Sequence, residues 1–173
     1  MWKLLTGELG KDGFESLLPK KLNMEMQNIL PHKFGIGLTD VVLIPGNNAA
    51  ELSKELMCSW IPNFYARLKN HVERVWKSTG NNHYSSPNVV AFTGKRQFQV
   101  LYKGTPPKIS YGKLSDSIPL PENWPFPKNS CEVWVLPSSS GRSALTHEER
   151  IGPYSELAKK IRSLSSPKLK GKQ

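Results

Sequence analysis

The chain has 173 residues, 38% of them hydrophobic, and a formal net charge of +10 at pH 7. This length and composition predict one domain with a hydrophobic core and leave too little chain for two. The positive charge favours a polyanionic partner, with nucleic acid preferred over an acidic membrane surface. The chain has neither a long apolar stretch nor a signal-peptide pattern, which predicts a soluble, intracellular protein without a membrane partner.

The first part of the chain is predicted to contain a short helix and a buried strand. Residues 2–5 have an apolar face at helical spacing. Residues 36–44, Ile36 to Ile44, are rich in branched apolar side chains, and Gly35 and Gly37 allow the backbone to approach a neighbour closely. This segment is therefore predicted to be a buried strand.

Two helices are predicted to follow. Residues 49–57 have a modest helical pattern, and Ser59 is expected to cap a stronger helix, because a serine hydroxyl can accept a hydrogen bond from a free N–H group of the first turn. The apolar side chains of the stronger helix recur at Ile61, Phe64, Tyr65, Leu68, Val72, Val75 and Trp76. The charged residues between them are predicted to face solvent.

A second strand is predicted at residues 89–92, and it ends in Thr93, Gly94 and Lys95. Residues 96–102 then have a helical pattern. A glycine and a lysine between a strand and a helix form a candidate phosphate site, because free N–H groups and the helix dipole point to the same place. The motif lacks the full spacing of a P-loop.

A third strand is predicted at residues 133–136, after a proline-rich extended connection over residues 103–130. Its short run of branched and aromatic residues is typical of a strand covered on both faces of a parallel sheet. A polar loop follows Pro137, with hydroxyls, backbone N–H groups and a planar cation suited to phosphate or to a base, at Ser138, Ser139, Ser140, Gly141 and Arg142. Taken alone, this stretch is more simply a serine-rich turn.

Thr146 and Glu149 predict a capping box, and the helix that follows has an apolar face formed by Tyr154, Leu157, Ile161 and Leu164. Residues 165–173 carry three lysines and are expected to be a disordered tail that attracts a polyanion. The order of elements predicts a three-layer α/β domain over residues 1–164.

The cysteines and histidines indicate neither a disulfide nor a metal site. Cys58 and Cys131 lie in unrelated contexts and are predicted to be free thiols in a reducing compartment. The histidines, His32, His71, His83 and His147, do not have the spacing of metal ligands.

Three segments taken together, LPHKFGIGLTD, VVAFTGK and VWVLPSSSGRSA, resemble the mismatch-specific thymine/uracil DNA glycosylases, a family that includes thymine DNA glycosylase and the bacterial mismatch-specific uracil DNA glycosylases. The resemblance covers residues 1–164, and its most specific piece is PSSSGR. Together the three segments favour a functional loop after Pro137 over a simple serine-rich turn. It implies a uracil-DNA-glycosylase-like α/β/α sandwich with a short parallel sheet.

The resemblance also implies a function: a monomeric enzyme of base-excision repair, in the nucleus or a bacterial nucleoid, that binds double-stranded DNA and flips out a thymine or uracil mispaired with guanine. It would hydrolyse the N-glycosidic bond with water, without a metal or cofactor. On this resemblance Ser138, Ser139 and Ser140 hold the DNA backbone and Arg142 fills the space left by the flipped nucleotide. Gly141 stands where the family often has a slightly larger residue. Gly94 and Lys95 grip a phosphate, and Thr39 lies beside the catalytic water.

The sequence departs from the family in its first motifs. The strand that carries the water-positioning asparagine, and a second motif of the base pocket, would precede Met1, so the sheet is expected to lack its first, central strand. We therefore expect a truncated product or part of a longer protein. The alternatives are a non-catalytic DNA-binding remnant and, less favoured because the aromatic residues lack base-stacking spacing, a basic RNA-binding domain.

Overall fold

The computed structural model describes residues 2–10, 14–45, 51–79, 86–138 and 144–165. The elements follow one another as α1 (Trp2–Leu5), the 3-10 helix η1 (Met24–Ile29), α2 (Leu30–Phe34), α3 (Lys54–Ser59), α4 (Ile61–Thr79), β1 (Val89–Thr93), α5 (Lys95–Gln99), β2 (Gly112–Lys113), β3 (Glu132–Leu136) and α6 (His147–Ser165). Residues 166–173 of the predicted tail lie outside the described residues.

The described residues form one mixed sheet of three strands in the order β1-β3-β2. β1 and β3 are parallel, with Val89 opposite Glu132 and Thr93 opposite Leu136. β2 is antiparallel to β3 and places Gly112 opposite Val135. The prediction of a purely parallel sheet was therefore wrong, because β2 comes from the proline-rich connection in which no regular element was expected.

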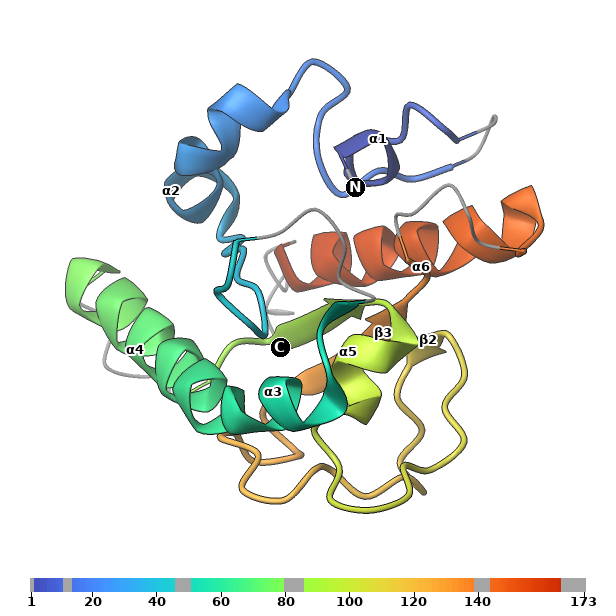
Figure 1. Ribbon diagram of the computed structural model, residues 1–173. Coiled ribbons are helices and arrows are strands. Elements are labelled where there is room, and N and C mark those ends of the chain that lie inside the picture. Colours follow the sequence, from blue (N-terminus) through green and yellow to red (C-terminus); the bar gives the residue numbers. More distant parts are fainter. Residues whose placement is uncertain (1, 11–13, 46–50, 80–85, 139–143, 166–173) are drawn as a thin grey trace, which may run out of the picture.

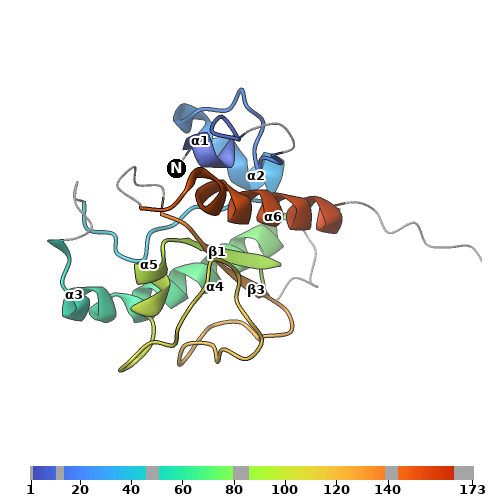
Figure 2. The same ribbon diagram turned by 90° about the vertical axis from the view of Figure 1, so that its right-hand side faces the viewer.

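Helices cover both faces of the sheet (Figures 1 and 2). On one face α1, α2 and α6 enclose a core that contains Trp134 and Leu136, and on the other face α3, α4 and α5 enclose a core that contains Val133 and Val135. Alternate side chains of β3 thus enter opposite cores. This confirms the prediction of a strand buried on both faces and makes the molecule an α/β structure with three layers.

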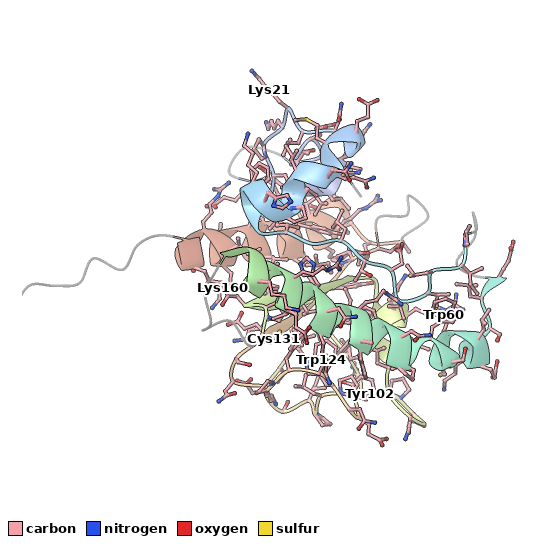
Figure 3. All side chains as sticks on the ribbon, turned by 90° about the vertical axis from the view of Figure 1, so that its left-hand side faces the viewer. Lys21, Trp60, Tyr102, Trp124, Cys131 and Lys160 are labelled. Carbon is pink, nitrogen blue, oxygen red and sulfur yellow. The ribbon has the colours of Figure 1, made fainter. Side chains whose placement is uncertain are left out.

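Aromatic side chains fill much of the core beneath α4. Trp124, labelled in Figure 3, comes from the proline-rich connection, and its ring centroid lies 5.8 Å from that of Tyr65 and 6.1 Å from that of Phe92. Offset and edge-to-face aromatic pairs at such distances add to the stabilisation that burial provides. The connection is therefore part of the core although it is largely irregular.

The segment predicted as the first buried strand is not a strand. Residues 36–45 form no regular element, have a bend at Val41 and pair with no strand of the described chain. Leu43 is 51% exposed, and only Val41 among the apolar residues of this segment is buried. The Arg67 guanidinium donates hydrogen bonds to the carbonyls of Asp40 at 2.8 Å and Val41 at 3.0 Å. A side chain of α4 thus binds backbone acceptors that a neighbouring strand would otherwise engage.

The observed helix boundaries in this region also differ from the predicted ones. Ser53, and not Ser59, is an N-cap: its hydroxyl accepts a hydrogen bond from the Leu56 N–H at 3.1 Å and begins α3. Ser59 lies at the end of α3, and its hydroxyl donates to the Leu56 carbonyl at 2.8 Å. The modest helix predicted over residues 49–57 therefore begins later and ends later.

The predictions for the second half of the chain agree better with the structure. β1, β3 and α6 form where the sequence indicated, whereas α5 begins one residue earlier and ends three residues earlier than the helix predicted over residues 96–102. The capping box is present: the Thr146 N–H donates to Glu149 Oε2 at 2.8 Å, and the Glu149 N–H donates to Thr146 Oγ1 at 3.2 Å. Cys58 and Cys131 are free thiols, and burial raises the pKa of Cys131 to about 12.

Glu132 ties the start of β3 to two other elements. Its carboxylate accepts hydrogen bonds from Lys160 of α6 at 2.8 Å, Lys113 of β2 at 3.2 Å and the Trp134 indole N–H at 3.2 Å. Partial burial raises the pKa of Glu132, but these three donors outweigh it and hold the pKa below its usual value. The ionised carboxylate therefore stabilises the folded state above the pKa of the unfolded chain, and this contribution is lost as the pH falls through the lower, folded pKa.

We predict that Glu132→Gln lowers the free energy of unfolding by about 1–2 kcal/mol at neutral pH, because the replacement loses the charge-assisted bonds. The difference from the parent protein should shrink as the pH falls through the acidic range, and urea denaturation at neutral and acidic pH measures it. Glu122→Gln is the control, because the ion pair of Glu122 with Lys103 is largely exposed and should contribute little. A difference that does not change with pH would contradict this account.

Candidate functional site

The parallel register of β1 and β3 brings two of the predicted loops together. Thr93 is opposite Leu136, so the two strands end at the same edge of the sheet. Gly94 and Lys95 continue from β1, and Pro137 and Ser138 continue from β3. Ligands of open α/β sheets bind at the carboxyl ends of strands. This edge, formed by Gly94, Lys95 and Ser138, is called the strand-end site below.

Part of the predicted site lies outside the residues that the structure describes. Ser139, Ser140, Gly141 and Arg142 lie outside the described residues. Their predicted contacts with a DNA backbone and with the space left by a flipped nucleotide therefore stay predictions. Ser138, the first residue of the predicted serine-rich loop, is half-buried at the end of β3.

The base of that loop is held in place by Tyr154 of α6. The Tyr154 hydroxyl donates a hydrogen bond to the Pro137 carbonyl at 2.9 Å, and both residues are fully buried. Burial raises the pKa of Tyr154 to about 12, although the nearby Arg150 acts in the opposite direction. The phenol therefore stays protonated and remains a donor at neutral pH. The loop after β3 consequently starts from a fixed point.

Gly94 has a backbone conformation that requires glycine. Its φ is 133° and its ψ is 139°, in a region that residues with a side chain rarely adopt. A Cβ atom here would also overlap the side-chain amide of Gln97 in the first turn of α5. Gly94 thus lets the chain turn from β1 directly into α5 and fixes the direction in which Lys95 leaves the sheet.

The Lys95 side chain has a partner that the sequence did not predict. Its Nζ atom lies 4.2 Å from the centroid of the Tyr111 ring, just before β2. A cation–π contact at a partly exposed site contributes about 0.5–1 kcal/mol. Charge-assisted hydrogen bonds to phosphate are stronger than neutral ones. The ammonium group is therefore held near the strand-end site by a contact weak enough for an anion to displace.

Thr39 lies in the irregular segment before α3, where it is exposed and its hydroxyl donates to the Asp40 carbonyl at 3.4 Å. The residue before it, Leu38, lines a cavity of about 550 Å³ that Thr93 also lines. Thr39 and Gly94 thus each follow a residue of the same cavity.

The cavity is lined mainly by apolar side chains and lies against the outer side of β1. His71 of α4 is its one titratable side chain among the described lining residues. Burial lowers the pKa of His71, and the neighbouring positive charge of Arg74 lowers it further, so the imidazole is neutral at neutral pH. The described residues contain no group of three His, Cys, Asp or Glu side chains that could hold a metal ion.

The sequence did not predict the contacts that two residues of this region make. Tyr111 was treated as part of an irregular connection, and Tyr154 only as one position on an apolar helix face. The available signal was the hydroxyl of Tyr154, because a buried tyrosine usually finds a hydrogen-bond partner. Nothing in the sequence indicated which carbonyl it would reach.

None of the helices in the described part of the chain is long and apolar enough to cross a membrane. A scan against protein-family models found no match, and a search of curated proteins found no significant match. Assignment to a family therefore depends on the three sequence segments and on how the structure arranges them.

We predict that Tyr154→Phe lowers the free energy of unfolding by about 1–3 kcal/mol, because the buried Pro137 carbonyl loses its donor. Thermal and urea denaturation measure the loss. Tyr102→Phe is the matched control: its hydroxyl donates to the Pro119 carbonyl at 2.8 Å at an exposed position, where water can replace it. Equal losses in the two variants would contradict a special role for the Tyr154 bond.

Proposed function

We propose that this protein is a mismatch-specific DNA glycosylase domain that binds duplex DNA at the strand-end site and removes thymine or uracil opposite guanine. The observation that carries the proposal is the parallel register of β1 and β3, because the strands that lead to Gly94 and Lys95 and to Ser138 end at the same edge of the sheet. These residues belong to two of the three segments that resemble the glycosylase family. The formal charge of +10 agrees with a polyanionic partner.

The physical requirements of base removal fit this arrangement. Flipping a nucleotide out of a duplex costs a few kcal/mol, which contacts to the flanking backbone must offset. Lys95 supplies a cation near the end of β1, and the buried Pro137 anchors the loop that leads to Arg142. An enzyme with these parts would hold the backbone from two loops and insert a side chain from one of them.

The reaction itself is a hydrolysis. The bond between the sugar C1′ and the base nitrogen breaks, water supplies the hydroxyl to C1′, and its proton balances the departing base. The product is an abasic site. Thr39 is the residue proposed to lie beside the attacking water, and its hydroxyl is exposed to solvent.

A second candidate is a protein that binds mismatched DNA without cutting the glycosidic bond. Thr39 closes the GIGLT stretch of the first matching segment, and no residue of the three segments matches the asparagine with which the family positions water. This candidate keeps the same strand-end site and the same DNA contacts. The two candidates differ only in turnover.

We predict that the purified protein binds G·U and G·T duplexes more tightly than fully paired duplex. Incubation with these duplexes followed by alkali tests turnover, because alkali breaks the strand at abasic sites. Breaks at the mismatched pyrimidine support the glycosylase, and mismatch binding without breaks supports the non-catalytic candidate. Binding without any preference for the mismatch, or tighter binding to single-stranded RNA, would contradict both.

We predict that Arg142→Ala weakens binding to mismatched duplex roughly tenfold and binding to paired duplex much less, because only a flipped nucleotide leaves a space to fill. Lys95→Ala is the comparison: it should weaken binding to both duplexes about equally and reduce the slope of log Kd against log salt by about 1. Fluorescence anisotropy over a salt series measures both. Equal losses on both duplexes for Arg142→Ala would make it an ordinary phosphate contact.

A further inference from the structure

β2 brings a third strand end to the edge where β1 and β3 end. In the antiparallel register Gly112 is opposite Val135, and Tyr111 directly precedes Gly112. This register places Tyr111 at the level of Leu136, which is opposite Thr93 in the parallel pair. Tyr111, Leu136 and Thr93 therefore form one row at the edge of the sheet that carries the strand-end site.

The contact between Lys95 and Tyr111 joins the two outer strands of the sheet at this edge. Lys95 follows β1, Tyr111 precedes β2, and β3 lies between those strands. Neighbouring strands lie about 4.8 Å apart, so the outer two are separated by roughly 10 Å. The Lys95 Nζ atom nevertheless lies 4.2 Å from the centroid of the Tyr111 ring. The lysine side chain is therefore directed from the β1 side of the sheet toward the β2 side.

The backbone fixes the place of the ring more firmly than that of the ammonium group. Gly112 has a φ of 104°, a region that residues with a side chain rarely adopt, and it is buried and paired with Val135 of β3. The Tyr111 ring is half-buried and packs against the core beneath α4. Lys95, in contrast, carries its charge on a flexible stem of four carbons. The ring consequently positions the ammonium group, and not the reverse.

The ammonium group of Lys95 keeps its hydrogen-bond donors available. Lys113 and Lys160 both pair with the carboxylate of Glu132. In the part of the chain that the structure describes, the Tyr111 ring is the contact of Lys95 Nζ, and no oxygen atom accepts a hydrogen bond from it. A ring face occupies one side of an ammonium group and leaves N–H donors on the other. A phosphate oxygen can therefore bind Lys95 while the ring contact is kept.

We propose that Tyr111 is a positioning residue of the strand-end site: its ring holds the Lys95 ammonium group in place for a phosphate of duplex DNA and keeps this contact in the complex. The ring restricts the lysine side chain before DNA arrives, so less conformational entropy is lost on binding. The inference rests on the proposed binding of DNA. It does not rest on mismatch recognition or turnover, because any phosphate of a duplex can be the ligand.

The first test measures binding of the full chain to a fully paired duplex by fluorescence anisotropy over a salt series. Tyr111→Leu keeps an apolar side chain without an aromatic face. It should weaken binding roughly three- to tenfold and leave the slope of log Kd against log salt unchanged, because Lys95 still neutralises its phosphate. Tyr111→Phe should bind like the parent protein, since a phenyl ring keeps the cation–π contact. Unchanged affinity of Tyr111→Leu, equal losses in both variants, or a changed slope overturns the proposal.

A double-mutant cycle separates positioning from a general loss of structure. Tyr111→Leu should cost no further affinity when it is added to Lys95→Ala, because the group that the ring positions is already gone. Lys103→Ala is the matched control, since Lys103 is exposed and pairs with Glu122, so its effect and that of Tyr111→Leu should add. Additive losses for Tyr111→Leu and Lys95→Ala would give Tyr111 a role independent of Lys95 and overturn the proposal.

Nuclear magnetic resonance on the unaltered protein needs no substitution of Tyr111. With isotope-labelled lysine, the ε-methylene protons of Lys95 should resonate upfield of those of the other lysines, because they lie near the face of an aromatic ring. The spectrum of Lys95→Ala identifies the signal. The upfield shift should persist when paired duplex is added. A signal without this shift in the free protein, or loss of the shift on binding, overturns the proposal.

The outcomes distinguish this inference from the proposed function. If the parent protein prefers mismatched duplex but Tyr111→Leu binds paired duplex as tightly as the parent does, only the positioning role fails. If binding depends on the ring but shows no preference for a mismatch, the positioning role stands and the proposed function fails. If the parent protein binds no duplex, both fail.

Discussion

The parallel pairing of β1 with β3 is the constraint on which the rest of the structure depends. β3 is buried on both faces, with Val133 and Val135 in one core and Trp134 and Leu136 in the other. Any strand that pairs with it is therefore fixed between the same two layers of helices. The register of the pair then decides which loops meet at the carboxyl edge and which backbone groups remain at the open edge.

The elements that the sequence predicted correctly carry their own local signals. β3 is a short apolar run that stops at Pro137, and α6 begins at a capping box whose two hydrogen bonds join residues three apart. Residues 36–44 have an apolar pattern just as suitable for a strand, yet they do not form one. A strand also needs a partner edge, and here Arg67, 26 residues further along the chain, binds the Val41 carbonyl instead. Local pattern cannot reveal that competition.

The candidate site, too, could be predicted from the sequence only in part. That Gly94, Lys95 and Ser138 follow strands ending at one edge could be predicted from the sequence, and the parallel register of β1 and β3 has both strands end there. The contacts that fix their geometry join distant residues: Lys95 lies over Tyr111, and Tyr154 reaches Pro137 across 17 positions. Such contacts depend on how α6 and the proline-rich connection pack onto the sheet, which composition and spacing do not encode.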